Sequence, residues 1–281
     1  MAESFSYRVV RVLVLLFLAA FTLYPLWTLI TISLSTATEA GAPFRWIPEF
    51  LTLHPYVAMW HTAPLLLYLK NSAIVSSSSA VVSLPIALLA AYALTRHRLR
   101  GRGVVLRVVL ATQAFPGVLF LLPLFVIYIS IEHTLGIPLD GTYLGLIVTY
   151  LTFALPFSIW MLTGYLAAVP PDIEEAARVD GASRMRAFIS MTIRMATPSI
   201  VAVGVFTFMT AWGEVLFASV LTDGATRTLP IGLQLYESAK GLVIYWNQLM
   251  AAALTVSVPV VVGFMVLQRY FVRGLSAGAI K

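Results

Sequence analysis

The feature that most constrains this chain is a series of long apolar segments separated by short polar ones. Six such segments follow one another along the 281 residues. An α-helix needs about 20 apolar residues to cross a bilayer core. Hydrophobic residues make up 60% of the chain and charged residues only 11%, whereas soluble proteins carry about a quarter charged residues. The sequence therefore predicts an all-α, polytopic membrane protein with six transmembrane helices.

The chain is expected to form a single transmembrane domain over residues 1–281. We place the six spans at 12–32, 69–95, 104–131, 143–168, 197–221 and 247–268. A loop at 169–196 separates the fourth and fifth spans, and a tail at 269–281 follows the sixth. The second span contains a serine run, Ser76–Ser79, which is typical of close packing between membrane helices.

Lysine and arginine are distributed unevenly between the two sides of the predicted spans. Four of the 18 basic residues fall on one side, namely Arg45, Lys70, Arg227 and Lys240. The other 14 fall on the opposite side, which holds both termini and the 169–196 loop. Because basic loops stay in the cytoplasm, we expect both termini and this loop to be cytoplasmic.

Several kinds of chemistry find no support in the sequence. Each lysine lacks the glycine-rich context and the following serine or threonine of a phosphate-binding loop. The four histidines, His54, His61, His97 and His133, show no metal-ligand spacing. There are no cysteines, and no basic cluster is interleaved with aromatic residues as in nucleic-acid-binding proteins. We expect a chain that is not an enzyme and holds no cofactor of its own.

The longest polar interruption in the second half of the chain is the stretch Pro170–Ile200. Two prolines open it and three acidic residues follow, which is typical of a helix N-terminus. Gly181 is suited to end this first helix in a left-handed cap, and Ser183 is suited to cap a second one. The stretch therefore predicts a helix, a sharp turn and another helix between two membrane spans. An ordinary amphipathic surface connection is the plain alternative.

The run Glu175-Ala176-Ala177, followed after three residues by Gly181, resembles the "EAA loop" of permeases of ATP-binding-cassette (ABC) importers. The longer run EEAARVDGAS is similar to the version in sugar permeases of the maltose-transporter type. The resemblance implies the fold of a type I importer permease and a docking helix that contacts a separate ATPase subunit. It implies ATPase-coupling roles for Ile173, Glu174, Glu175, Ala176, Ala177, Arg178, Asp180 and Gly181. The family usually has a proline where this chain has Arg194.

In that assignment, Glu175 and Asp180 make polar contacts with the ATPase. Ala176 and Ala177, with Ile173, form a small apolar face that allows close approach.

Three further stretches resemble the same family. Thr152–Leu162 is similar to its fourth span, and Thr228–Leu233 is similar to its last external loop, which in the maltose system reaches toward the binding protein. Gln268–Lys281 is similar to its C-terminal tail, which reaches between the ATPase subunits. The tail residues implied in that contact are Gly274, Ser276, Gly278 and Lys281.

The resemblance also implies the surrounding assembly. The partners would be a second permease subunit, two ATPase subunits that bind ATP and magnesium, and an extracytoplasmic solute-binding protein. The complex would lie in the cytoplasmic membrane of a bacterium or archaeon. ATP binding would close the ATPase pair and turn the spans outward, and hydrolysis would return them inward as sugar enters.

Polar residues within the predicted spans are candidates for the substrate path. Glu214 is the only acid inside a predicted span, and buried charges in membranes are expensive and often functional. Gln113, Trp212 and Asn247 could also contact a sugar through hydrogen bonds or an aromatic face. For each of these residues, hydrogen bonding or packing between helices is the competing interpretation.

Two other function classes remain open from the residues alone. An ion-coupled secondary transporter would usually carry several buried acids and repeated halves, but this chain has one such acid and no visible repeat. A membrane scaffold or receptor without transport is the second alternative.

Overall fold

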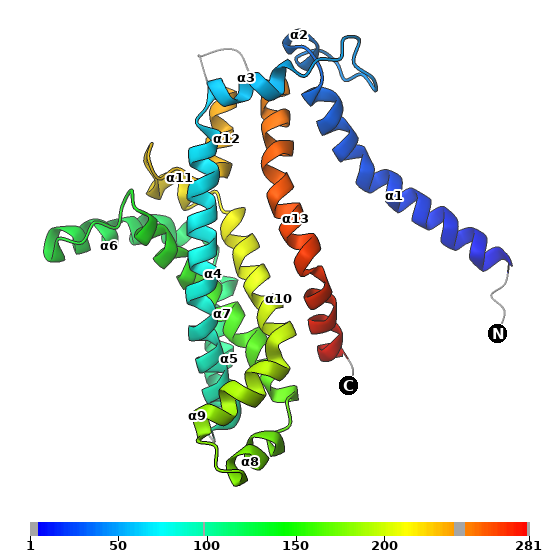
Figure 1. Ribbon diagram of the computed structural model, residues 1–281. Coiled ribbons are helices and arrows are strands. Elements are labelled where there is room, and N and C mark those ends of the chain that lie inside the picture. Colours follow the sequence, from blue (N-terminus) through cyan, green and yellow to red (C-terminus); the bar gives the residue numbers. More distant parts are fainter. Residues whose placement is uncertain (1–4, 98, 239–244, 280–281) are drawn as a thin grey trace. The chain divides into compact units, whose positions relative to one another are not determined.

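The computed structural model describes residues 5–97, 99–238 and 245–279, and the regular elements in these ranges are all helical (Figure 1). The long helices are α1 (Phe5–Ser33), α4 (Leu65–Arg96), α6 (Val118–Leu135), α7 (Tyr143–Ala168), α10 (Ile193–Trp212) and α13 (Trp246–Ala279). The short helices are α2 (Ala37–Ala40), α3 (His54–Thr62), α5 (Arg102–Ala111), α8 (Asp172–Val179), α9 (Arg184–Ala187), α11 (Ala218–Leu221) and α12 (Leu229–Ser238). A 3₁₀ turn, η1 (Thr112–Ala114), follows α5, and a π-helical turn, η2 (Phe188–Thr192), precedes α10.

Six of the described helical segments are long and apolar enough to cross a membrane. The chain divides into two compact units, one formed by Met1–Leu66 and Gly232–Pro259 and the other by Leu67–Ile231 and Val260–Lys281. The larger unit contains α5 to α11 and nearly all of α4.

A seam of small residues on α4 forms part of the core of the larger unit. Serine or alanine recurs every three or four residues along one face, and every member is buried: Ser72, Ser76, Ser79, Ser83, Ala87 and Ala91. Small side chains allow membrane helices to approach closely. At Gly204 of α10, an added Cβ would lie 3.0 Å from the Leu84 side chain of α4, so the two helices are close at this point. Ser76 and Ser79 of the serine run therefore have the packing role that we expected, whereas Ser77 is exposed and Ser78 is only partly buried.

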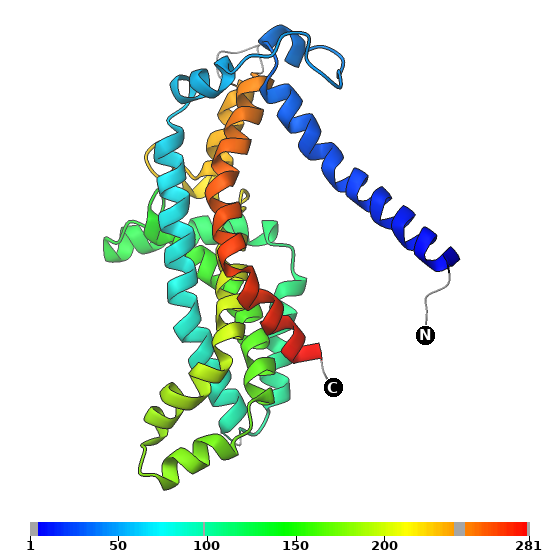
Figure 2. The same cartoon turned by 45° about the vertical axis from the view of Figure 1, so that its right-hand side comes forward.

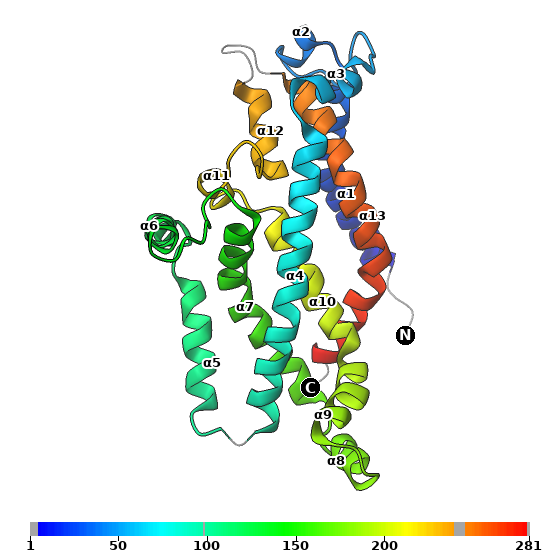
Figure 3. The ribbon, with the colours of Figure 1, turned by 60° about the vertical axis from the view of Figure 1, so that its left-hand side comes forward.

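The third predicted span, 104–131, is not one continuous helix, so this prediction was wrong. α5 ends at Ala111, η1 follows, and α6 begins only at Val118. Figure 3 shows α5 beside α7 while α6 is seen nearly end-on, so the chain turns sharply between them. Pro116 and Gly117 lie in this break, and both residue types weaken a helix interior.

The fifth predicted span, 197–221, was wrong for a similar reason. α10 begins at Ile193 and ends at Trp212, and Gly213 to Phe217 separate it from α11. By contrast, α7 has the bounds expected for the fourth span, and α13 continues beyond the sixth span into the predicted tail as far as Ala279.

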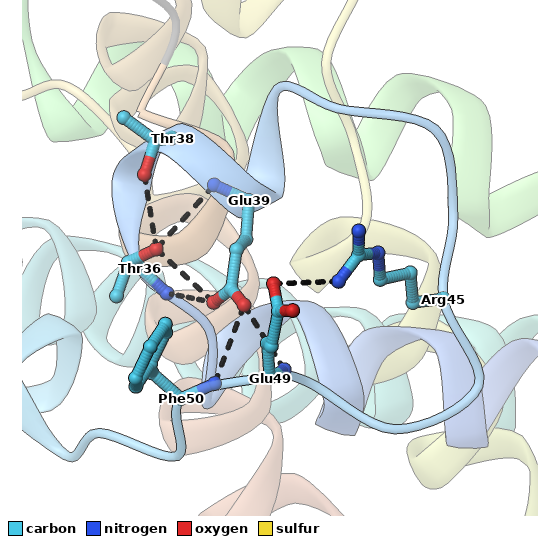
Figure 4. A network of polar contacts seen from close by, with 6 residues as sticks. All are labelled: Thr36, Thr38, Glu39, Arg45, Glu49 and Phe50. Atoms are coloured by element: carbon cyan, nitrogen blue, oxygen red, sulfur yellow. Dashed lines mark hydrogen bonds and ion pairs between the residues drawn. The ribbon is translucent and has the colours of Figure 1, made fainter.

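In the smaller unit, the segment between α1 and α4 contains two short helices, α2 and α3, and a local network of hydrogen bonds. Glu39 closes a capping box with Thr36 at the start of α2 (Figure 4). Its other carboxylate oxygen accepts hydrogen bonds from the backbone N–H groups of Glu49 and Phe50, at 3.0 and 3.3 Å. The Thr36 backbone N–H and these other donors hold the Glu39 pKa below its usual value. A cavity of about 240 Å³ lies beside this network and is lined in part by Arg45.

Gly145, in the first turn of α7, gives a test of the close packing around this helix. An added Cβ would lie 1.9 Å from the Leu139 carbonyl oxygen, so the backbone itself would have to move. We predict that Gly145→Ala lowers the free energy of unfolding by about 1–3 kcal/mol, as overpacked sites do. Thermal unfolding in detergent would measure the change.

Gly164→Ala is the matched control because Gly164 is in the same helix and has no atom within 4 Å of the added Cβ. Equal melting temperatures for the two variants would contradict this account of α7.

Candidate coupling and translocation sites

The polar stretch after α7 forms the predicted helix, turn and helix. α8 ends in a left-handed residue, Gly181, with φ of +90°. The Ala182 N–H bonds the Ala177 carbonyl and the Gly181 N–H bonds the Arg178 carbonyl, which is the hydrogen-bond pattern of a Schellman cap. The Ser183 hydroxyl accepts from the Arg186 N–H at the start of α9. Both predicted capping residues are therefore confirmed in their structural roles.

α8 is a surface helix at one end of the larger unit, beside the end of α4 and the start of α10 (Figure 2). Its residues divide into an inner and an outer set. Glu174 and Ala177 are buried, and Ile173 is partly buried. The exposed outer set is Glu175, Ala176, Arg178, Val179 and Asp180, with Val179 at 87% exposure.

This division corrects one expectation from the sequence. We placed Ala176 and Ala177 on one small apolar face with Ile173, but Ala176 is exposed while Ala177 is buried. Successive residues on a helix are about 100° apart, so the two alanines face different surroundings. Ala177 packs inside this chain, and Ala176 belongs to the outer set.

The Glu174 carboxylate is the centre of a buried polar cluster. It accepts hydrogen bonds from the Thr192 hydroxyl, from Arg96 Nε at 2.8 Å and from the Tyr92 hydroxyl at 3.0 Å. The Arg96 and Glu174 side chains are only 12% and 10% exposed. Arg96 also donates to the Val169 carbonyl at 2.8 Å. Desolvation tends to raise the Glu174 pKa, but the three hydrogen bonds outweigh it and lower the pKa, so the group is charged at neutral pH.

Arg194 and the tail residues, which the family resemblance also singled out, add little to the description of the site. Arg194, where the family usually has proline, is exposed in the first turn of α10. The chain enters α10 through the π-helical turn η2 without a break. In the tail, Gly274, Ser276 and Gly278 lie in the helical backbone of α13, their side chains are outside the described part, and Lys281 lies outside the described residues.

A second cluster lies where the two broken spans meet α7. Gln113, in the first break, donates to the Phe153 carbonyl at 3.0 Å. Glu214, in the second break, accepts from the Tyr150 hydroxyl at 3.0 Å. Its carboxylate also accepts from the N–H groups of Phe217 and Ala218, at 2.9 and 3.0 Å. Both candidates therefore bind to one turn of α7.

Aromatic packing joins the same two breaks. The Phe153 and Phe217 rings are stacked with centroids 4.7 Å apart, and Gly117 lies against the Phe217 ring. A cavity of about 50 Å³ beside this stack is lined by Thr207, Glu214 and other residues of α7 and α10, and it has room for a water molecule. Glu214 thus ties a helix break to α7 and also borders a small cavity.

The other two substrate-path candidates are not part of this cluster. Trp212 stacks on Phe208 with centroids 5.4 Å apart. Asn247 belongs to the smaller unit, is buried, and donates to the Ser35 carbonyl at 3.2 Å. The predicted external loop Thr228–Leu233 is largely the start of α12, where Ser72 accepts from the Leu229 N–H at 2.8 Å.

The sequence did not point to four residues of these clusters, which are Arg96, Tyr92 and Thr192 at the first and Tyr150 at the second. Arg96 could have been noticed, because a charged residue at the end of a long apolar helix lies close to the loops at that end of the span. The tyrosines offered no such signal, because an aromatic residue in a membrane span is ordinarily packing. Within the described residues, no group of three or more His, Cys, Asp or Glu side chains could hold a metal ion.

Comparison with known proteins decides the family. Residues 83–277 match the family described as the inner membrane component of binding-protein-dependent transport systems. The chain belongs to this family. The resemblance of the EAA loop is thereby confirmed, and the protein is a multi-pass membrane permease.

Two relatives align with the whole chain. The sulfoquinovosyl glycerol transport system permease protein SmoH of Agrobacterium fabrum is 34% identical, over 100% of this chain and 96% of the relative. The trehalose/maltose transport system permease protein MalG of Thermococcus litoralis is 31% identical, over 100% of this chain and 99% of the relative.

A solved structure supports the fold. It is a crystal structure of a bacterial ABC transporter involved in importing the acidic polysaccharide alginate. The TM-score is 0.79 at 20% identity, with 96% of this chain and 99% of that chain covered. The permease therefore has the fold of an ABC importer membrane subunit.

The bond between Glu214 and Tyr150 can be tested by a double-mutant cycle. Glu214→Ala leaves three donors without their acceptor, and we predict a loss of about 1–3 kcal/mol in stability, the cost of unsatisfied polar groups. Tyr150→Phe should cost less, and the two changes should be non-additive by about 1 kcal/mol. Denaturation in detergent would measure all four proteins, and strictly additive losses would contradict the bond.

Proposed function

We propose that this permease is one of two membrane subunits of an ABC importer that carries a sugar, a mono- or oligosaccharide, into the cell. ATP hydrolysis takes place in separate ATPase subunits, which bind ATP and magnesium. A solute-binding protein delivers the sugar from outside. The complex lies in the cytoplasmic membrane of a bacterium or archaeon, with both termini of this chain in the cytoplasm.

The observation that carries the proposal is the outward face of α8. It combines charged residues with Ala176 and the highly exposed Val179 on a short helix that ends in a Schellman cap. An exposed apolar residue within a charged surface is suited to a protein interface. We assign this face to the ATPase, with Glu175 and Asp180 as its polar contacts.

The sugar assignment rests on the relatives, which are named as transport proteins for trehalose, maltose and sulfoquinovosyl glycerol. The break at 112–117 supports a second permease subunit. Residues Thr112 to Pro116 are exposed in this chain alone, although irregular backbone at membrane depth must be covered by protein or line an aqueous cavity. A second membrane subunit would supply such a covering or wall.

The docking face can be tested by purifying the tagged permease from native membranes in mild detergent and identifying any ATPase that is recovered with it. We predict that Glu175→Arg combined with Gly181→Pro abolishes recovery of the ATPase. The first change reverses a charge on the outer face, and the second removes the Gly181 N–H that bonds the Arg178 carbonyl and forbids its positive φ.

Glu132→Arg, an exposed charge reversal at the far end of α6, is the control and should retain the ATPase. If the wild type recovers no ATPase in several detergents, the importer proposal is wrong. Ion-coupled transport, with Glu214 as the acid to test, would then replace it.

A further inference from the structure

Adjacent glutamates on α8 have opposite surroundings. Glu175 is exposed, whereas Glu174 is 7% exposed and directed into its own chain. The Glu174 carboxylate receives two donors from α4, Tyr92 and Arg96, and one from η2, Thr192. One side chain of the surface helix is therefore bonded to the elements at the ends of two membrane helices, α4 and α10.

Arg96 extends the connection to a third membrane helix. Its second guanidinium nitrogen donates to the Val169 carbonyl, directly after the end of α7. The α4, α7 and α10 ends thus converge on one ion pair, and all of its members belong to the same compact unit. Figure 1 shows α8 and α9 at this end of the three helices.

Apolar packing continues directly from the ion pair into the membrane helices. The centroids of the Tyr92 and Phe188 rings lie 4.1 Å apart. They belong to a buried cluster that includes Leu162 and Leu166 of α7 and Val203 of α10. A displacement of Glu174 is therefore passed to a close-packed core, which transmits strain because it contains little free space.

Stability alone does not explain a charged pair at this position. Desolvating two charges is expensive, and well-packed apolar residues of similar volume often serve as well or better. A hydrogen-bonded ion pair, however, fixes direction and spacing in a way that apolar contacts do not. This geometry suits a joint that must transmit movement without yielding.

We propose that Glu174 is a positioning residue that, through Arg96, Tyr92 and Thr192, couples α8 rigidly to α4, α7 and α10. The outer face of α8 receives the movement of the ATPase. The hydrogen bonds of Glu174 with Arg96, Tyr92 and Thr192 transmit this movement to the spans. This inference rests on the proposed function, because it needs an ATPase that moves α8.

The absence of cysteines in the chain permits a direct test in the assembled complex. Spin labels on Pro171→Cys, an exposed residue directly before α8 and outside its outer set, and on the exposed Met209→Cys in α10 report the distance between the docking helix and a span. Pulsed electron paramagnetic resonance would compare the nucleotide-free complex with the complex trapped by ATP and vanadate. In the otherwise wild-type chain, we expect one narrow distance distribution that is the same in both states.

Glu174→Gln removes the charge that holds Arg96, and we expect the distribution to broaden and to shift between the two states. Asp172→Asn, an exposed acid in the first turn of the same helix, is the control and should retain the narrow distribution. The charge-swapped pair Glu174→Arg with Arg96→Glu should restore part of the narrow distance distribution. A variant that had only lost overall stability would not be rescued in this way.

An unchanged distribution in Glu174→Gln would overturn the inference, as would a distance that already shifts in the wild type. If Glu174→Gln fails to assemble, Tyr92→Phe and Thr192→Val decide the question, because each removes one hydrogen bond and leaves the ion pair. Broadening in both supports the joint, and no change in either contradicts it. If the wild type forms no complex with an ATPase, the failure lies in the proposed function itself.

Discussion

Backbone hydrogen bonding is the constraint on which this structure depends. A span in a bilayer must satisfy its own N–H and C=O groups, so a helix can break only where other groups replace the lost bonds. The Glu214 carboxylate replaces them at the second break by accepting from the N–H groups of Phe217 and Ala218. At the first break, the Gln113 amide donates to the Phe153 carbonyl, which attaches the break to α7 but satisfies no backbone group of the break itself. Both breaks are therefore attached to α7, which is continuous from Tyr143 to Ala168.

The same principle of satisfied polar groups organises the other end of the larger unit. There the buried charge of Glu174 is balanced by Arg96 and bonded by two hydroxyl groups. Its neighbour Glu175 is left exposed for a partner. The motif thus combines an inner residue that binds the chain to itself with an outer residue that we assign to the ATPase. The inward and outward roles are therefore carried by two adjacent residues of the same helix, Glu174 and Glu175.

Local sequence signals predicted the local structure well. Gly181 and Ser183 cap α8 and α9 as expected, because caps depend on a few neighbouring residues. The apolar segments located all six long helices, and the bounds of α7 were predicted correctly, but the spans at 104–131 and 197–221 each contain a break that was not predicted. The serine seam of α4 was also foreseeable, because small residues in a membrane helix have few other uses.

The long-range arrangement could not be predicted from the same signals. The partners of Glu214 and Gln113 on α7 lie 64 and 40 residues away in the sequence. The Arg96–Glu174 pair joins residues 78 apart. An apolar run through residues 104–131 is also compatible with one helix or two, because hydropathy alone does not reveal where a helix breaks. The inward direction of Glu174 could not be predicted either, because it depends on partners that are distant in the sequence.

The central claim is that the outer face of α8 contacts an ATPase, and site-specific crosslinking tests it most directly. A benzophenone maleimide on Val179→Cys, in a chain without other cysteines, would report which protein lies beside α8 in intact membranes. The account predicts a crosslinked product with the ATPase subunit, and none from Ile47→Cys, an exposed site in the segment between α1 and α4. Labelling of Val179→Cys by an impermeant maleimide from outside the cell, without an ATPase product, would contradict the account.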